Sequence, residues 1–311
     1  MDENITSSNI INSFWDNISN NNGVYCKIYF CKKNKSEYTA YQPSVSEKIK
    51  NTIVELVKEY LQGKANLVPV HYSPTRACTD LEIENCYSEY VGNYKALDAA
   101  FSKTDHVDTN IKPSELAFYC LEFGDLDDTF KYRLYRRITK FRRLSSKGIL
   151  AYFRGGTLDK IDDEMFGIDG SIDILQVEEQ FWIFNHIALE RIFDLKDKFI
   201  FQAKAAMDIL REANCIENFD AFEEDCLSDH RYHKTLAKIM DSNENFGESL
   251  VNNFDGIREA IDTFDLPIEI TETLPPKIVY ENKSQRMDIL RIIDDAYCKS
   301  IIGNRQVINR D

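Results

Sequence analysis

Seventeen residues near the middle of the chain hold an unusual concentration of positive charge. Residues 131–147 contain eight basic side chains and no acidic one, whereas the full chain of 311 residues has 38 Lys and Arg against 52 Asp and Glu. An acidic protein repels polyanions over most of its surface, so a local excess of cations predicts the place where a polyanion such as nucleic acid binds. We call residues 131–147 the basic segment. Its cations are Lys131, Arg133, Arg136, Arg137, Lys140, Arg142, Arg143 and Lys147.

The first part of the basic segment has the composition of a β-strand, over residues 130–138. Because side chains of a strand alternate between its two faces, one face would carry Lys131, Arg133, Tyr135 and Arg137. The opposite face, with Tyr132, Leu134, Arg136 and Ile138, is mostly apolar and predicts core. We therefore expect phosphate contacts from the first face, with Arg136, Lys140, Arg142, Arg143 and Lys147 as further DNA contacts and Tyr135 stacking on a base. In the alternative interpretation, these arginines form ion pairs with carboxylates of the chain itself or of a partner subunit.

A group of carboxylates follows the basic segment and allows a second hypothesis. Oxygen ligands of this kind hold Mg²⁺ in enzymes that cleave phosphodiesters, so a metal-dependent nuclease stays an alternative. The spacing fits neither an EF-hand loop nor the acid, acid-x-Lys pattern of restriction nucleases, because Gln180 and Phe181 follow Glu179. A solvated acidic loop is the favoured interpretation. The carboxylates are Asp159, Asp162, Asp163, Glu164, Asp169 and Asp173.

Other chemistry has weaker support in the sequence. Cys226, His230 and His233 have the spacing of one helix face and could ligate zinc, but a buried thiol and two flanking histidines explain them more simply. Patterns typical of hydrolase triads, dinucleotide binding and P-loop ATP binding are absent. We assign no catalytic residue, no metal ligand and no cofactor, and we do not expect an enzyme.

The composition predicts a folded and acidic protein. The chain is 43% hydrophobic, has a formal net charge of −14, and is long enough for about two domains. Its longest charge-free stretches are shorter than the roughly 18 apolar residues that cross a bilayer. The N-terminal residues lack the charged and apolar regions of a secretory signal, so we expect a cytoplasmic protein with reduced cysteines.

Residues 1–112 predict an N-terminal α/β region. A hairpin is expected from residues 24–31 and 38–41, and a helix with apolar residues at three-to-four spacing over 45–60, capped by Ser44 or Ser46 and stopped at Gly63. Val68-Pro69-Val70 predicts an edge strand, because proline cannot donate a hydrogen bond to a neighbouring strand.

Residues 113–311 predict an antiparallel meander that packs on several C-terminal helices. Strands are expected at 116–123, 130–138, 149–153, 172–177 and 181–184. The apolar period then changes to that of helices, with one long helix over 189–210, two more over 219–240 and 244–264, short strands at 268–270 and 278–280, and a last helix over 284–301. The expected fold class is α+β.

The order of features between residues 148 and 200 is distinctive. Residues 115–302 resemble the KwaB component of the bacterial Kiwa anti-phage defence system, which has a similar order of strand, strand-Asn and Glu-x-Ile-Phe helix. The motifs that carry the resemblance are Gly148 to Phe153, Ile172-Asp173-Ile174, Phe181 to Asn185, Leu189 to Phe193, the spacing of Cys226, Asp229 and Arg231, and Asp294-Asp295-Ala296-Tyr297 with Ser300.

This resemblance implies a cytoplasmic effector that works at the inner face of the cytoplasmic membrane. It implies assembly with KwaA, a multi-span membrane protein, and binding of double-stranded phage DNA without sequence preference, which impedes replication and late transcription. The assignment of the DNA contacts to the basic segment comes from charge alone. The net charge of −14 is unusual for a DNA-binding protein, so we also expect a homodimer that brings two basic segments together. A protein adaptor whose basic segment docks an acidic partner, without DNA, is a further alternative.

Overall fold

The fold consists of two compact units. The computed structural model describes residues 7–20, 24–77, 79–104, 115–127, 129–138, 151–154, 157–160, 167–243, 245–300, 302–303 and 305–309. The first unit comprises residues 1–72 and 78–195, and the second comprises residues 73–77 and 196–311. Each unit has a hydrophobic core of its own.

An eight-stranded mixed sheet forms the first unit, with the strand order β2-β1-β5-β6-β9-β10-β4-β3. All neighbouring pairs are antiparallel except β3 and β4, which are parallel. A separate hairpin, β7–β8, lies between β6 and β9 in the chain. The strands are β1 (Tyr25–Asn34), β2 (Glu37–Tyr41), β3 (Val68–His71), β4 (Glu82–Tyr87), β5 (Phe118–Gly124), β6 (Lys131–Arg137), β7 (Ala151–Arg154), β8 (Thr157–Lys160), β9 (Ile174–Val177) and β10 (Gln180–Ile183).

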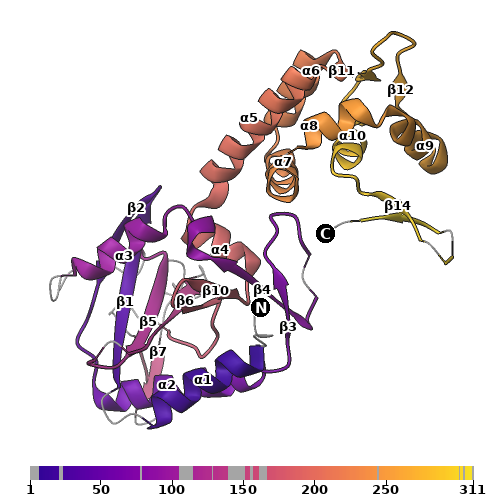
Figure 1. The fold of residues 1–311 in the computed structure, drawn as a ribbon. Helices are drawn as coiled ribbons and strands as arrows, with labels where there is room; N and C mark the ends of the chain where they lie inside the picture. The colour runs from indigo at the N-terminus through magenta and orange to yellow at the C-terminus, as the bar shows by residue number, and fades with distance from the viewer. Residues whose placement is uncertain are drawn as a thin grey trace. The chain divides into compact units, whose positions relative to one another are not determined.

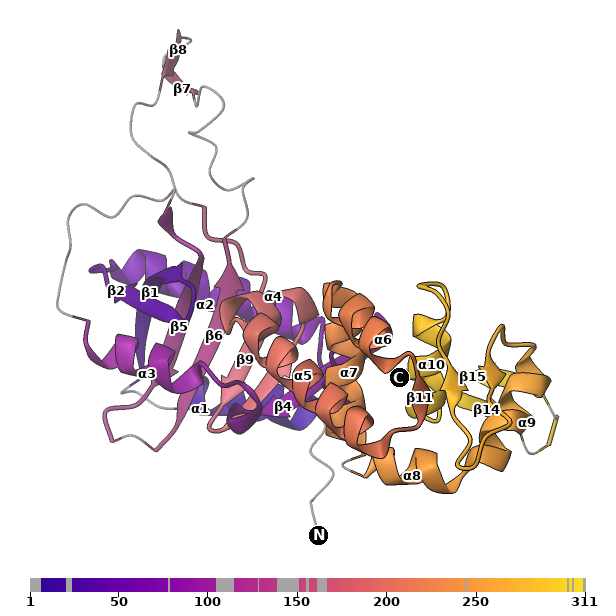
Figure 2. The ribbon, with the colours of Figure 1, turned by 90° about the horizontal axis from the view of Figure 1, so that it is seen from above.

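Helices cover both faces of this sheet (Figure 1). Helices α1 (Ser7–Asn20) and α2 (Glu47–Gln62) pack on one face, where their apolar residues share a core with Tyr132 and Leu134 of β6. Helices α3 (Tyr94–Ser102) and α4 (His186–Ile192) lie on the opposite face, as the second view also shows (Figure 2). Strand β6 is central in the sheet, so both of its faces are covered. A short 3₁₀-helix, η1 (Ser88–Tyr90), precedes α3.

Local sequence signals explain several of these elements. Helix α2 begins after Ser46, whose side-chain oxygen accepts a hydrogen bond from the backbone N–H of Ile49, as an N-cap residue does. Strand β3 lies at the edge of the sheet, where Pro69 removes one N–H that would otherwise point outward. The predicted helix cap and edge strand are both confirmed.

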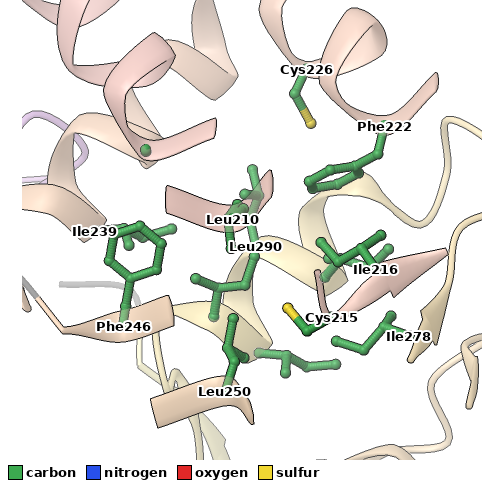
Figure 3. Packing of buried hydrophobic residues seen from close by; sticks show 14 of the residues in the cluster. Leu210, Cys215, Ile216, Phe222, Cys226, Ile239, Phe246, Leu250, Ile278 and Leu290 are labelled. Carbon is green, nitrogen blue, oxygen red and sulfur yellow. The ribbon is translucent and has the colours of Figure 1, made fainter. Parts of the chain in front are cut away.

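The second unit is mainly helical. Its helices enclose a core in which Leu210, Phe222, Phe246 and Leu290 converge (Figure 3). The helices are α5 (Leu195–Ala213), α6 (Phe219–Leu227), α7 (His230–Ser242), α8 (Phe246–Asn252), α9 (Phe254–Phe264) and α10 (Arg286–Ile293). The strands are β11 (Ile216–Glu217), β12 (Glu269–Ile270), β13 (Ile278–Val279), β14 (Tyr297–Lys299) and β15 (Gln306–Ile308), in a three-stranded and a two-stranded sheet.

The α+β class is confirmed, and β5, β6, β9 and β10 form the predicted antiparallel meander. Several details differ from the sequence predictions. The helices expected over residues 219–240 and 244–264 are each divided in two, into α6 and α7 and into α8 and α9, and the last expected helix, 284–301, ends at Ile293. The expected boundary at residues 112–113 lies inside the first unit, because strands from both sides of it pair in one sheet. The meander packs on helices of its own unit, whereas the C-terminal helices build a second core. The helix expected over residues 189–210 is broken between α4 and α5, where Asp194 adopts a left-handed φ of 55°.

Candidate nucleic-acid interface

Arg133 is a buried part of the first unit. Its side chain is only 7% exposed, and its guanidinium donates from Nε to Glu122 Oε2 at 2.8 Å and from Nη1 to Asp98 Oδ1 at 2.6 Å. The guanidinium also lies 4.8 Å from the centre of the Phe101 ring. The expected exposed face of β6 is therefore wrong at Arg133, because α3 covers this position and supplies Asp98 and Phe101.

Tyr135 is also inside the protein. It is fully buried among aromatic rings, including Phe181 and Phe193, and its hydroxyl donates a hydrogen bond to Gln176 Oε1 at 2.6 Å. Its ring has no free face on which a base could stack. The expectation of an exposed Tyr135 is corrected for the same reason as that of Arg133, since helices cover this side of the sheet.

Arg136 is neutralised by carboxylates of the chain. Its Nη1 lies 2.6 Å from Asp173 Oδ1, and its Nε lies 3.4 Å from Asp169 Oδ1. Burial alone would lower the pKa of Arg136, but Asp173 and Asp169 raise it above its usual value. Arg133 and Arg136 therefore form ion pairs within the chain, as the alternative interpretation of the sequence expects.

Asp173 organises the neighbouring backbone. Its carboxylate, which is 1% exposed, accepts hydrogen bonds from the backbone N–H of Arg137 at 2.6 Å and from Asn185 Nδ2 at 3.0 Å, in addition to Arg136. These contacts occupy the two carboxylate oxygens. Within the described parts of the chain, no group of three or more His, Cys, Asp or Glu side chains could hold a metal ion. Of the nuclease candidates, Asp162, Asp163 and Glu164 lie outside the described residues.

The two remaining described cations of the basic segment, Lys131 and Arg137, lie at the two ends of β6. Lys131 is exposed at the start of β6. Arg137, at the other end, is partly buried, and among the described residues no carboxylate oxygen lies within 4 Å of its guanidinium. Burial lowers the pKa of Arg137, the charges of Arg191 and Arg136 lower it further, and the charge of Asp173 opposes them in part. Lys140, Arg142, Arg143 and Lys147 lie outside the described residues.

Arg191 is a cation that the sequence analysis did not select. It is exposed in the last turn of α4, close enough to Arg137 to affect the pKa of that residue. Fifty-four positions separate the two arginines in the chain, so no local pattern connects them. Their proximity could be found only from the packing of α4 against β6.

His186 fixes the other end of α4. Its Nδ1 lies 2.8 Å from Glu84 Oε2 and its Nε2 lies 3.0 Å from Glu190 Oε1, while the ring of Tyr72 stacks on it. Burial alone would lower the pKa of His186, but the hydrogen bonds to Glu190 and Glu84 raise it to about 9. His186 is therefore a cation at neutral pH and ties α4 to β4.

An open cavity of about 410 Å³ lies beside His186 and Arg136. Asp173 and Asn185 also line it, and these polar groups already hold one another. In the second unit, His233 Nε2 lies 2.8 Å from the Leu227 carbonyl oxygen and Cys226 is fully buried, so neither is presented as a zinc ligand. We assign no cofactor or metal to these groups.

Comparison with known proteins identifies the family. A family model described as "Kiwa protein KwaB-like" matches residues 114–303. The chain belongs to the KwaB-like family. This confirms the resemblance over residues 115–302 and places the chain in Kiwa anti-phage defence. No curated protein matches the chain, and no solved structure does.

The KwaB-like match contains the whole basic segment and all of α4. The match begins just before β5 in the sequence. Strands β1 and β4, which pair with β5 and β10, therefore precede the matched residues in the chain. The N-terminal residues thus complete a sheet that the KwaB-like residues alone would leave with open edges. None of the helices in the described part of this KwaB-like chain is long and apolar enough to cross a membrane.

Proposed function

We propose that this KwaB-like chain is an anti-phage effector that binds double-stranded DNA without sequence preference. Binding of phage DNA would impede its replication and transcription. The observation that carries the proposal is the basic segment, which holds eight cations and no acid in a chain with a net charge of −14. Phosphate contacts supply affinity without base information, so such a segment suits binding that ignores sequence.

The ion pairs of β6 reduce the number of cations that could contact DNA. Arg133 and Arg136 are engaged by carboxylates, and Tyr135 is buried, so we no longer expect these three side chains to contact DNA. The proposed contacts are Lys131, Arg137, Lys140, Arg142, Arg143 and Lys147. This smaller set fits a protein that is acidic elsewhere and is expected to bind DNA in a strongly salt-dependent way.

The test is the affinity for a duplex oligonucleotide of mixed sequence, measured over a range of salt concentrations. The variant replaces Lys140, Arg142, Arg143 and Lys147 with Gln. Each lost phosphate contact flattens the slope of log affinity against log salt by about 0.9, so four contacts would flatten it by roughly 3.6. A native protein that binds no duplex at low salt would refute the proposal.

A matched control separates contact from net charge. Lys48, Lys58, Lys95 and Lys103 are exposed in the first unit, and their replacement by Gln changes the net charge by the same amount. We expect this control to keep nearly the native salt slope. If the control and the test variant lose affinity equally, the basic segment is not the DNA site.

We also propose that the chain acts at the inner membrane face through a KwaA-like multi-span membrane protein, and that it forms a homodimer. The dimer would bring two basic segments to one duplex, which helps to offset the acidic remainder of the chain. We expect the protein to sediment with membranes only when the KwaA-like protein is co-expressed. Sedimentation equilibrium of the purified protein should give twice the chain mass of 36.2 kDa, and the chain mass alone would refute the dimer.

A further inference from the structure

Arg137 is an exception among the arginines of β6. Arg133 and Arg136 each have two carboxylates within 4 Å, whereas the described residues offer none to the Arg137 guanidinium at that distance. Asp173, whose charge acts on Arg137, gives its oxygens to Arg136, to Asn185 and to the backbone N–H of Arg137 itself, not to the Arg137 guanidinium. A partly buried guanidinium without a counter-charge is unfavourable, unless a ligand supplies that charge.

Arg191 adds a second positive charge at the same place. It extends from the last turn of α4 and is exposed, and the described residues place no carboxylate within 4 Å of its guanidinium either. The helix C-terminus favours a cation at Arg191 but does nothing to offset the charge of Arg137. Phe193, two residues after Arg191, packs on Tyr135, two residues before Arg137, with ring centres 5.6 Å apart, so the end of α4 lies over the end of β6 on the face that carries Arg137.

The backbone around both arginines is held firmly. The Arg137 N–H is fixed by Asp173, and the last carbonyls of α4 are held by side chains from three other segments. Lys33 Nζ donates to the Arg191 carbonyl, and Tyr38 Oη donates to the Ile192 carbonyl at 2.7 Å. Asn93 Nδ2 donates to the Phe193 carbonyl at 2.8 Å. The backbone from which the two arginines extend is therefore fixed before a ligand binds, which lowers part of the entropic cost of binding.

We propose that Arg137 and Arg191 together bind one phosphate group of a nucleic-acid backbone. Guanidinium groups match the oxygens of phosphate in geometry and charge, and two of them from different elements would clamp one phosphate. This inference rests on the proposed DNA binding, and it adds Arg191, a residue outside the basic segment, to the interface. The same chemistry would accept free inorganic phosphate, so the experiment distinguishes the two sources.

The first arm measures duplex DNA affinity against salt for the native protein, Arg191→Gln, Arg137→Gln and the double variant. We expect Arg191→Gln to weaken binding roughly tenfold, and we expect the double variant, in which the phosphate loses both cations, to flatten the salt slope by about 0.9. Because both arginines contact one phosphate, the double variant should lose less than the product of the two single losses. Lys58→Gln, on the exposed side of α2 at the opposite face of the sheet, is the matched control and should bind as the native protein does.

The second arm measures urea denaturation with and without inorganic phosphate at constant ionic strength. If the arginine pair accepts the free anion, inorganic phosphate should stabilise the native protein more than it stabilises Arg191→Gln. If the pair binds only a phosphate of a nucleic-acid backbone, inorganic phosphate should stabilise both proteins equally. An Arg191→Gln variant with the native duplex affinity would overturn the inference, while DNA binding by the native protein would keep the proposed function. If the native protein binds no duplex, the proposed function fails, and the inference for a nucleic-acid phosphate fails with it. A phosphate effect confined to the native protein would then identify a free-anion site.

Discussion

Arg133 and Arg137 lie four residues apart on the same face of one strand, yet their surroundings differ. Arg133 is enclosed by α3 and the buried carboxylate of Glu122, whereas Arg137 lies at the end of the strand beside a second arginine. The charge of Arg133 is neutralised by carboxylates within the protein, whereas the charge of Arg137 can be neutralised by a ligand. A run of basic residues in a sequence therefore combines side chains that hold the fold with side chains that can bind a ligand.

The largest expected effect is on stability, at Arg133. Replacement of Arg133 by Met would leave Glu122, which is 4% exposed, without its main partner, and should lower the free energy of unfolding by about 3–5 kcal/mol. Both tryptophans, Trp15 and Trp182, belong to the first unit, so their fluorescence during urea denaturation reports on this unit.

A double variant sharpens this prediction. Arg133→Met combined with Glu122→Leu removes both buried charges and should recover most of the lost stability, because the cost comes from an unpaired buried charge. Equal stability losses in the single and double variants would mean that packing, not charge, makes Arg133 important.

The next effect concerns His186, which holds the end of α4 opposite to Arg191. Its pKa is raised to about 9 in the folded protein from an ordinary 6.5. Because this pKa is raised, protonated His186 stabilises the folded protein fully below about pH 6.5, and this stabilisation is lost as the pH rises through about 9. The contribution to the free energy of unfolding is roughly 3 kcal/mol at most. The stability difference between the native protein and His186→Gln should shrink over this range. A difference that is constant with pH would contradict the charged triad with Glu84 and Glu190.

Arg136 should show an intermediate effect. Arg136→Gln leaves the buried Asp173 with the hydrogen bonds from Asn185 and the Arg137 backbone, so we expect a loss of about 1–3 kcal/mol in the free energy of unfolding. The same denaturation assay measures it. Arg137→Gln, in comparison, should change stability by less than about 0.5 kcal/mol, because no partner is lost. A loss at Arg137 as large as that at Arg136 would remove the distinction between them.

The sequence predicted much of the first unit. The cap at Ser46, the edge strand at Pro69 and the meander containing β6 follow from local signals, and the structure confirms them. The family resemblance was also correct. The alternation along β6 correctly placed Tyr132 and Leu134 in the core.

The same alternation could not predict the burial of Arg133 and Tyr135. The alternation of side chains along a strand shows which residues share a face. It does not show whether helices from elsewhere in the chain cover that face. Arg191 was missed because its role depends on the packing of α4 near the end of β6. The break after α4 was missed because the apolar stripe continues through Phe193 into α5, and only the backbone at Asp194 interrupts the helix.

The most direct test of the account compares Arg137→Gln with Arg136→Gln in duplex DNA binding over a salt series. The two residues are neighbours, and both substitutions remove one positive charge, so they differ chiefly in whether carboxylates already neutralise the side chain. We predict that Arg137→Gln weakens duplex binding roughly tenfold and that Arg136→Gln leaves the affinity unchanged at each salt concentration. Equal affinities for the two variants would contradict the division of β6 into structural and ligand-binding arginines.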